Sequence, residues 1–385
     1  MKFSKIPILF LIPLAFAKGQ KNKQAVEQLD ALVVESSPLD TKLNQYTQGV
    51  NILEQDNLDK ARGATIAETL SDIPGVAESY FGPNANRPII RGLDKNRVRM
   101  LQNGVDTFDV SAQSEDHAVP IDPLLVERIE VLRGSSALSY GTSSIGGAVN
   151  VIDRSIPTQP FGRTGASVRS SYNSVNEGWN YGAIGFTGND SWSFQINGST
   201  QDFENYDAPD GFIKPDGTAS SRVENSYGDS STIGFGGARH WDGGYAGFSF
   251  TNYENTYGVP GEEGAKIELE SDRFEARSEL EINDSEWLTG VELNFGYGDY
   301  LHAESHIEEE HEEHEGEHEG QEEGHDEHGD EPTKYFREGW EGRVAFKHEL
   351  GDLRGVLGFH GLFDELKIDG EKTIFTGGVD EENGD

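Results

Sequence analysis

The sequence contains no cysteine and only two methionines, one of which is the initiator. Without cysteine the chain can form neither a disulfide framework nor a thiolate metal site. The shortage of sulfur also disfavours a Cu(I) site. A metal site in this chain must therefore use imidazole and carboxylate groups, which suit zinc, nickel and cobalt and would bind Cu(II) more tightly still.

Basic residues are scarce as well: 31 lysines and arginines face 69 aspartates and glutamates, and the formal net charge is -38. Such an acidic chain repels nucleic acid and attracts cations, so we expect no nucleic-acid partner. Catalytic patterns are also missing, because no nucleophile–base arrangement or phosphate loop stands out. His311-Glu312-Glu313-His314 has the wrong spacing for a zinc-protease helix. We expect no enzyme and no catalytic cofactor.

After residue 17 the sequence has no apolar run long enough for a transmembrane helix. Residues 1–17 are typical of a signal peptide, with basic Lys2 and Lys5, an apolar stretch at Ile6–Leu14 and small residues at Ala15-Phe16-Ala17. The apolar stretch is too short for a permanent anchor. We therefore expect export without a helical anchor, which leaves a periplasmic protein, a secreted protein or an outer-membrane barrel.

The chain is rich in glycine, with 47 residues, and 10% of it is aromatic, which suits many short strands and turns. From about residue 164, apolar and polar residues alternate, as in Ser191–Asn197. Tight turns are predicted at Gly188–Asp190, Trp241–Gly244, Asn283–Ser285 and Leu350–Asp352, and long polar connections near 203–228, 254–265 and 303–332. Alternation of short and long connections is typical of an outer-membrane barrel, here with about nine strands in residues 156–385.

Residues 45–155 show a different sequence pattern, with a helical segment among short strands, and predict a compact mixed α/β domain. Thr65–Leu70 predicts a short helix, and Val98–Val105 predicts two strands around an Asn-Gly turn. Val126–Gly134 and Val149–Ile152 predict further strands. The preceding residues 18–44 form a polar arm. Its β-prone segment is Asp30, Ala31, Leu32, Val33, Val34 and Glu35, which could add to the edge of a partner's sheet or have no such role.

Three segments in order, Ala64–Val76, Arg87–Val105 and Asp122–Val151, closely resemble the plug domain of TonB-dependent receptors. This resemblance implies a mixed α/β plug inside a membrane β-barrel of 22 strands. It also implies that Asp30–Glu35 is the TonB box. The partners would be TonB with its inner-membrane energising complex and outer-membrane lipid, in the outer membrane of a Gram-negative bacterium.

Nine strands cannot close a barrel of this size, so we interpret the chain as an N-terminal fragment of the 22-stranded plugged barrel. Within the plug, Arg91 and Arg133 match family arginines that meet carboxylates of the barrel. Such pairing would hold the plug in the lumen, whereas ordinary surface ion pairs are the alternative.

The segment Leu301–Glu331 combines seven of the eleven histidines with 15 carboxylates and contains no lysine or arginine. Its histidines are His302, His306, His311, His314, His318, His325 and His328. Imidazole and carboxylate oxygen are both zinc ligands, so the segment predicts an external loop that binds a divalent metal ion. A solvated acidic loop is the alternative. Counting turns from a periplasmic plug places this loop on the extracellular side.

A second candidate lies in the plug, where Asp116 and His117 occur within Ser114–Ala118. The pair could offer one oxygen and one nitrogen to a metal, although a histidine bonded to the backbone is the simpler interpretation. This stretch resembles the plug of ZnuD-type zinc receptors, which implies that Asp116 and His117 hold zinc beneath a His-rich loop, with further ligands from the barrel.

We therefore predict a TonB-dependent receptor that imports zinc into the periplasm. Nickel or cobalt, or a chelated cargo such as a ferric siderophore or haem, remain alternatives within transport. A metal-sequestering surface protein is the alternative outside it. No role is expected for His240, His348 or His360, which lie singly on predicted strands.

Overall fold

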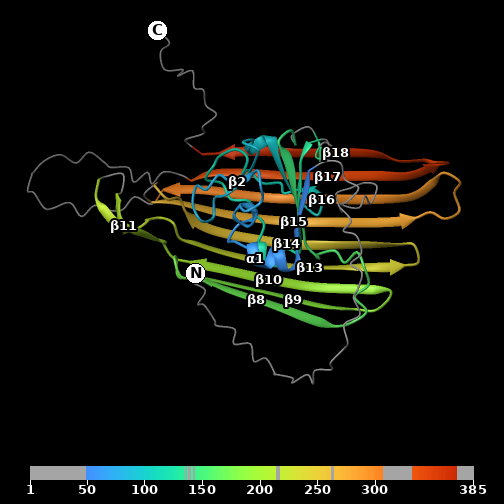
Figure 1. Cartoon of the computed structure of the whole chain (residues 1–385), viewed down its shortest axis with the longest axis horizontal. Coiled ribbons are helices and arrows are strands. Elements are labelled where there is room, and N and C mark those ends of the chain that lie inside the picture. Colours follow the sequence, from blue (N-terminus) through green and yellow to red (C-terminus); the bar gives the residue numbers. More distant parts are fainter. Residues whose placement is uncertain are drawn as a thin grey trace, which may run out of the picture.

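The computed structural model describes residues 49–134, 144–213, 217–261, 264–306 and 332–370, together with residues 137, 140 and 141. A small mixed domain packs against one face of a large antiparallel sheet (Figure 1). The signal peptide, the arm with Asp30–Glu35 and five of the histidines in the acidic tract lie outside the described residues. Those five are His311, His314, His318, His325 and His328.

The small domain, called the plug from here on, contains a five-stranded sheet in the order β1-β6-β7-β4-β5. Its strands are β1 (Val50–Glu54), β4 (Val98–Gln102), β5 (Val105–Asp106), β6 (Arg128–Leu132) and β7 (Gly147–Ile152). Its other elements are α1 (Gln55–Ala61), α2 (Ile66–Leu70), the hairpin of β2 (Val76–Glu78) and β3 (Pro88–Ile90), and the 3-10 turns η2 (Lys95–Arg97) and η3 (Pro123–Leu125).

Local sequence signals explain the predicted plug elements, which the structure confirms. Helix α2 begins after Thr65, whose hydroxyl accepts a hydrogen bond from the Glu68 amide, while the Glu68 carboxylate accepts one from the Ala64 amide. Between β4 and β5, Asn103 and Gly104 both have positive φ angles, 53° and 80°, as a tight hairpin turn requires. The apolar residues of these elements then meet in two buried clusters of the plug.

The large sheet has nine strands in the order β18-β17-β16-β15-β14-β13-β10-β9-β8, and every neighbouring pair is antiparallel. The strands are β8 (Gly165–Asn173), β9 (Gly178–Gly188), β10 (Trp192–Phe203), β13 (Gly228–Trp241), β14 (Gly244–Gly258), β15 (Ala265–Glu281), β16 (Leu288–His306), β17 (Thr333–Leu350) and β18 (Leu353–Asp369). The strand count and the four tight turns are as predicted. A separate hairpin of β11 (Asp207–Ile213) and β12 (Ala219–Arg222) lies between β10 and β13.

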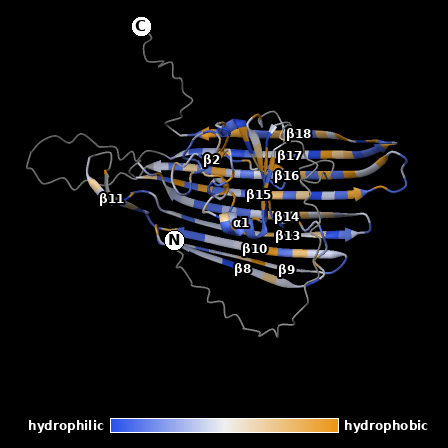
Figure 2. Ribbon diagram, in the orientation of Figure 1, coloured by the Kyte–Doolittle hydropathy of each residue, from blue (hydrophilic) through white to orange (hydrophobic). Residues whose placement is uncertain are grey.

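Apolar and polar residues alternate along these strands (Figure 2), and the polar face is the one turned toward the plug. In β10, Ser193 and Gln195 are buried, whereas Phe194 and Ile196 are 48% and 59% exposed. A soluble sandwich would bury its apolar face, so this inversion is typical of a membrane barrel that encloses a polar interior. Among the described helices, none is both long and apolar enough to cross a membrane.

The strands are longer than the sequence pattern indicated, and this corrects one prediction. β14 continues to Gly258 and β16 continues to His306, so residues 301–306 belong to a strand and not to the predicted loop 301–331. Period two is preserved there, because Tyr300 and His302 are buried on the inner face. Charged and polar residues, such as His302, Glu304 and Ser305, interrupt the apolar–polar alternation in this part of the chain and obscured the pattern.

Candidate metal centre

His117 lies in the plug segment between β5 and η3, and its side chain is only 1% exposed. Its Nδ1 lies 3.0 Å from the carbonyl oxygen of Val110, to which it can donate a hydrogen bond. Its Nε2 points toward the barrel and lies 2.8 Å from Oε1 of Glu304. The backbone contact fixes the orientation of the ring, so that Nε2 is the nitrogen available to a ligand.

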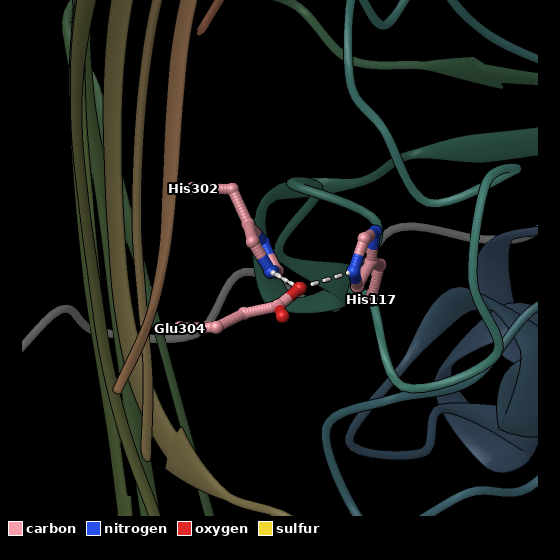
Figure 3. Close-up of side chains that lie close together, drawn as sticks. All are labelled: His117, His302 and Glu304. Atoms are coloured by element: carbon pink, nitrogen blue, oxygen red, sulfur yellow. Dashed lines mark hydrogen bonds and ion pairs between the residues drawn. The ribbon is translucent and has the colours of Figure 1, made fainter. Parts of the chain in front are cut away.

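The barrel contributes His302 and Glu304, which are two residues apart on β16 and therefore face the same side. Nε2 of His302 lies 3.2 Å from Oε1 of Glu304, so this oxygen lies between two imidazoles (Figure 3). Tyr300 lies two residues before His302 on the same face of β16, and its hydroxyl is 3.3 Å from Nδ1 of His302. Both histidines thus have one nitrogen engaged by the protein and the other directed at the carboxylate.

The spacing of these groups fits a metal ion. One ligand atom from each of His117, His302 and Glu304 lies within 4.8 Å of the others, and the two imidazole centroids are 4.1 Å apart. In a tetrahedral zinc site with bonds of about 2.1 Å, ligand atoms are about 3.4 Å apart. Small side-chain rotations would therefore bring all three onto one ion. Within the ranges that the structure describes, this is the one such group.

Of the predicted site residues, His117 and His302 are brought together, and Asp116 lies near them. The Asp116 carboxylate is 3.9 Å from Nε2 of His117 and accepts a hydrogen bond from the Ser114 hydroxyl. His306 ends β16. Glu304 was not singled out from the sequence, although its position two residues after His302 is the signal that could have identified it.

The electrostatics of His117 favour a positive charge at this point. Burial by itself lowers the pKa of the imidazole. The hydrogen bond to Glu304 and the charge of Asp116 outweigh burial, so that the pKa of His117 is raised above its ordinary value. A cation bound here would replace the proton that His117 shares with Glu304.

An aromatic and apolar cluster connects the plug with the sheet beside this group. Val110 and Ala118 of the plug are buried in it, together with residues from the barrel. The barrel residues of this cluster are Tyr253, Tyr257, Val259, Ala265, Ile267, Leu269, Tyr300 and Tyr335. Tyr335 contacts the rings of both histidines, whose side chains are almost fully buried, whereas Glu304 keeps 25% of its side chain exposed.

Glycines of β16 allow the plug to approach the sheet closely. Gly296 and Gly298 lie on the same face as His302, and a Cβ atom at Gly296 would overlap Val105 of the plug. A Cβ atom at Gly298 would lie 2.6 Å from Cδ2 of Phe108. The absence of side chains at both positions therefore sets the distance between the plug backbone and the strand that bears His302.

Ion pairs also join the plug to the sheet. Arg99 of β4 makes one of them, since its Nη2 lies 3.0 Å from Oε1 of Glu341 on β17. Among its contacts, Arg133 donates to the Asn51 side chain and to the Pro74 carbonyl, both in the plug. Arg91 is exposed.

Comparison with known proteins agrees with this architecture. The fold resembles the solved copper transporter OprC, with a TM-score of 0.64 and 15% identity over 85% of this chain and 48% of that one. In sequence, the chain is 28% identical to the hemin receptor of Yersinia pestis over 201 residues, which are 50% of this chain and 29% of that protein. It is 26% identical to the vitamin B12 transporter of Photobacterium profundum over 245 residues, 60% of this chain and 37% of that protein.

These likenesses define a plug domain joined to barrel strands. Residues 42–148 match the family model described as the TonB-dependent receptor plug domain. The chain spans about a third of the length of these curated relatives and about half of the solved transporter.

Proposed function

We propose that this chain belongs to a TonB-dependent receptor of the Gram-negative outer membrane that imports zinc into the periplasm. The plug family and the outward apolar face of the sheet support the receptor class. The observation that carries the choice of cargo is the cluster of His117, His302 and Glu304. Two imidazoles and a carboxylate are a common zinc ligand set, and the absence of cysteine disfavours Cu(I).

The ligand set is divided between two bodies, and this division suggests how the ion is released. His117 belongs to the plug, whereas His302 and Glu304 belong to a barrel strand. If TonB binds the arm at Asp30–Glu35 and displaces the plug, His117 moves away from the other two ligands. The ion then keeps only part of its coordination, and its affinity falls at the moment when a path to the periplasm opens.

The acidic tract between β16 and β17 would act before this site. Residues 307–331 contain five histidines and many carboxylates without a compensating lysine or arginine. This composition attracts divalent cations and would raise their concentration beside the outer end of β16. The ion would then transfer to His302 and Glu304, which are continuous with the tract in sequence and are completed by His117.

The experiment uses the complete gene product in a strain that lacks other zinc receptors, and it measures TonB-dependent uptake of radioactive zinc. The variants are His117→Ala, His302→Ala, Glu304→Gln and a deletion of 307–331. His240→Ala is the matched control, because His240 is a buried histidine on β13, near the tight-turn end, where it contacts Ser193. Nickel, cobalt and haem are tested as competitors.

We expect the three point variants to lose most uptake at every zinc concentration, while His240→Ala behaves as the wild type. The deletion should reduce uptake only at limiting zinc, because a gathering segment matters when ions are scarce. Normal zinc uptake by all three point variants would refute the proposed site. Competition by haem but not by free metal ions would instead identify the receptor as one for a chelated cargo.

A further inference from the structure

Tyr257, near the end of β14, is completely buried and directs its hydroxyl at the plug. The hydroxyl donates a hydrogen bond to the carbonyl oxygen of Asp116, at 2.8 Å. It also accepts a hydrogen bond from the amide of Ala118, at 3.0 Å. These two backbone groups flank His117, so one barrel side chain holds the plug chain on both sides of the metal-site histidine.

This contact restricts the position of His117 more than packing alone would. A phenol has one hydrogen to donate, and here it donates to the plug and also accepts from it. The ring of His117 is fixed independently by the carbonyl of Val110. The backbone and the ring are therefore anchored separately, which leaves little freedom for Nε2.

The same row of the sheet carries Tyr257 and the barrel carboxylate. Tyr257 pairs with Ile267 on β15, and Ile267 pairs with Glu304 on β16. The barrel position that fastens the plug segment is thus fixed relative to the position that supplies a ligand, through two neighbouring strand pairings. A small movement of this segment would change the distance between His117 and Glu304 directly.

We propose that Tyr257 is a positioning residue for the metal centre, which forms with full affinity only while this hydroxyl holds the plug segment 116–118. The proposal rests on the proposed function, because it assumes that His117, His302 and Glu304 bind a divalent cation. Tyr257 does not touch the ion. It acts through His117, and its role is to keep a ligand from one body in register with two ligands from the other.

The test measures zinc affinity of the purified complete gene product by titration, together with the visible spectrum of bound Co²⁺. Tyr257→Phe keeps the ring and removes the hydroxyl. Tyr253→Phe is the matched control, because Tyr253 is buried on the same face of β14 and its hydroxyl contacts Ser230 and Asn255 of the barrel. We expect Tyr257→Phe to weaken zinc binding about tenfold or more, the range found for groups that orient metal ligands, and Tyr253→Phe to change it less than twofold.

Two readouts separate positioning from general stability. The Co²⁺ spectrum should change in Tyr257→Phe, because the coordination of His117 changes, and stay constant in Tyr253→Phe. In a His117→Ala background, Tyr257→Phe should have no further effect on affinity, because the ligand through which it acts is missing. A general loss of stability caused by Tyr257→Phe would instead weaken binding in this background as well, so the comparison separates the two explanations.

The outcomes are distinguishable. If the unaltered protein does not bind zinc, or if His117→Ala binds it as tightly, the proposed function fails. If His117→Ala binds zinc more weakly than the unaltered protein, but Tyr257→Phe retains full affinity and an unchanged Co²⁺ spectrum, the inference about Tyr257 is wrong. Equal weakening by Tyr253→Phe, or an additive effect in the His117→Ala background, would also overturn it.

Discussion

Replacing Glu341 should loosen the plug more than any exposed change on the same strand. Glu341 is 2% exposed and accepts hydrogen bonds from the Arg99 guanidinium at 3.0 Å, from the Asp106 amide at 2.6 Å and from the His360 ring. Two of these three donors belong to the plug. In Glu341→Gln the side chain keeps its size, but it loses its charge and one acceptor oxygen becomes a donor.

The magnitude follows from what remains after the change. Breaking a buried ion pair costs about 3–5 kcal/mol when the partner is left without compensation. Arg99 keeps a second carboxylate, Asp106, at 3.2 Å, so we expect a smaller loss of about 2–3 kcal/mol. This corresponds to a shift of about 30- to 150-fold in the equilibrium between docked and undocked plug.

Hydrogen exchange of the amides in 98–106 follows this equilibrium, because undocking removes the Asp106–Glu341 hydrogen bond that holds the end of the β4–β5 hairpin and lets the hairpin open. We expect exchange to accelerate by the same factor in Glu341→Gln. The matched control is Glu338→Gln, an exposed carboxylate on the same strand that accepts from the Tyr297 hydroxyl. Equal protection of 98–106 in the two variants would refute the conclusion that Glu341 holds the plug.

Three other predictions concern the fit of the plug, a helix start and the lipid face. Gly298→Ala should push the plug off β16 and destabilise docking by about 1–3 kcal/mol. Hydrogen exchange of the amides in 105–108 should then be faster. Gly342→Ala is the control and should have no effect, because a Cβ atom there meets no atom within 4 Å. Thr65→Ala should destabilise the plug by about 1 kcal/mol in thermal unfolding. Ile196→Arg should cost about 2–4 kcal/mol for folding into a bilayer, and Ile213→Arg, equally exposed but on the β11–β12 hairpin, should not.

The architecture could be predicted from the sequence because its turns, helix starts and strands are each determined by a few adjacent residues. The Asn103-Gly104 turn, the capped helix at Thr65 and the four tight turns of the large sheet each depend on a few adjacent residues. Alternation of period two gives the strands, and the plug motifs identify the domain before them. These features do not require knowledge of which distant segments meet.

The candidate metal centre could be predicted only in part, because two of its residues, His117 and His302, are 185 residues apart in the chain. His117 was recognised from its neighbours, and His302 was counted within the acidic tract. The tract conceals the continuation of β16 as far as His306, since histidines and carboxylates occur both within the strand and after it. Only the alternation of Tyr300, His302 and Glu304 identifies these residues as one face of a strand.

The partners of the plug arginines could not be assigned from the sequence for a related reason. A motif identifies Arg91 and Arg133 as family positions but does not give the register between the plug and the barrel. In the structure, Arg99 reaches Glu341 because β5, which pairs with β4, lies against β16 and β17. That register depends on the shape of two surfaces, including the glycines of β16, and no local pattern encodes it.

The proposed metal site, which the plug and the barrel share, would link cargo binding to plug docking in both directions. If docking raises the affinity for the ion by a given factor, the ion must stabilise the docked plug by the same factor, because the coupling free energy is reciprocal. A 1,000-fold difference in affinity would correspond to about 4 kcal/mol. The loaded receptor would then resist plug displacement more than the empty one, and work applied through TonB would be needed most when an ion is bound. His117 is the residue through which this coupling must act, since in the described centre it is the ligand that the plug supplies.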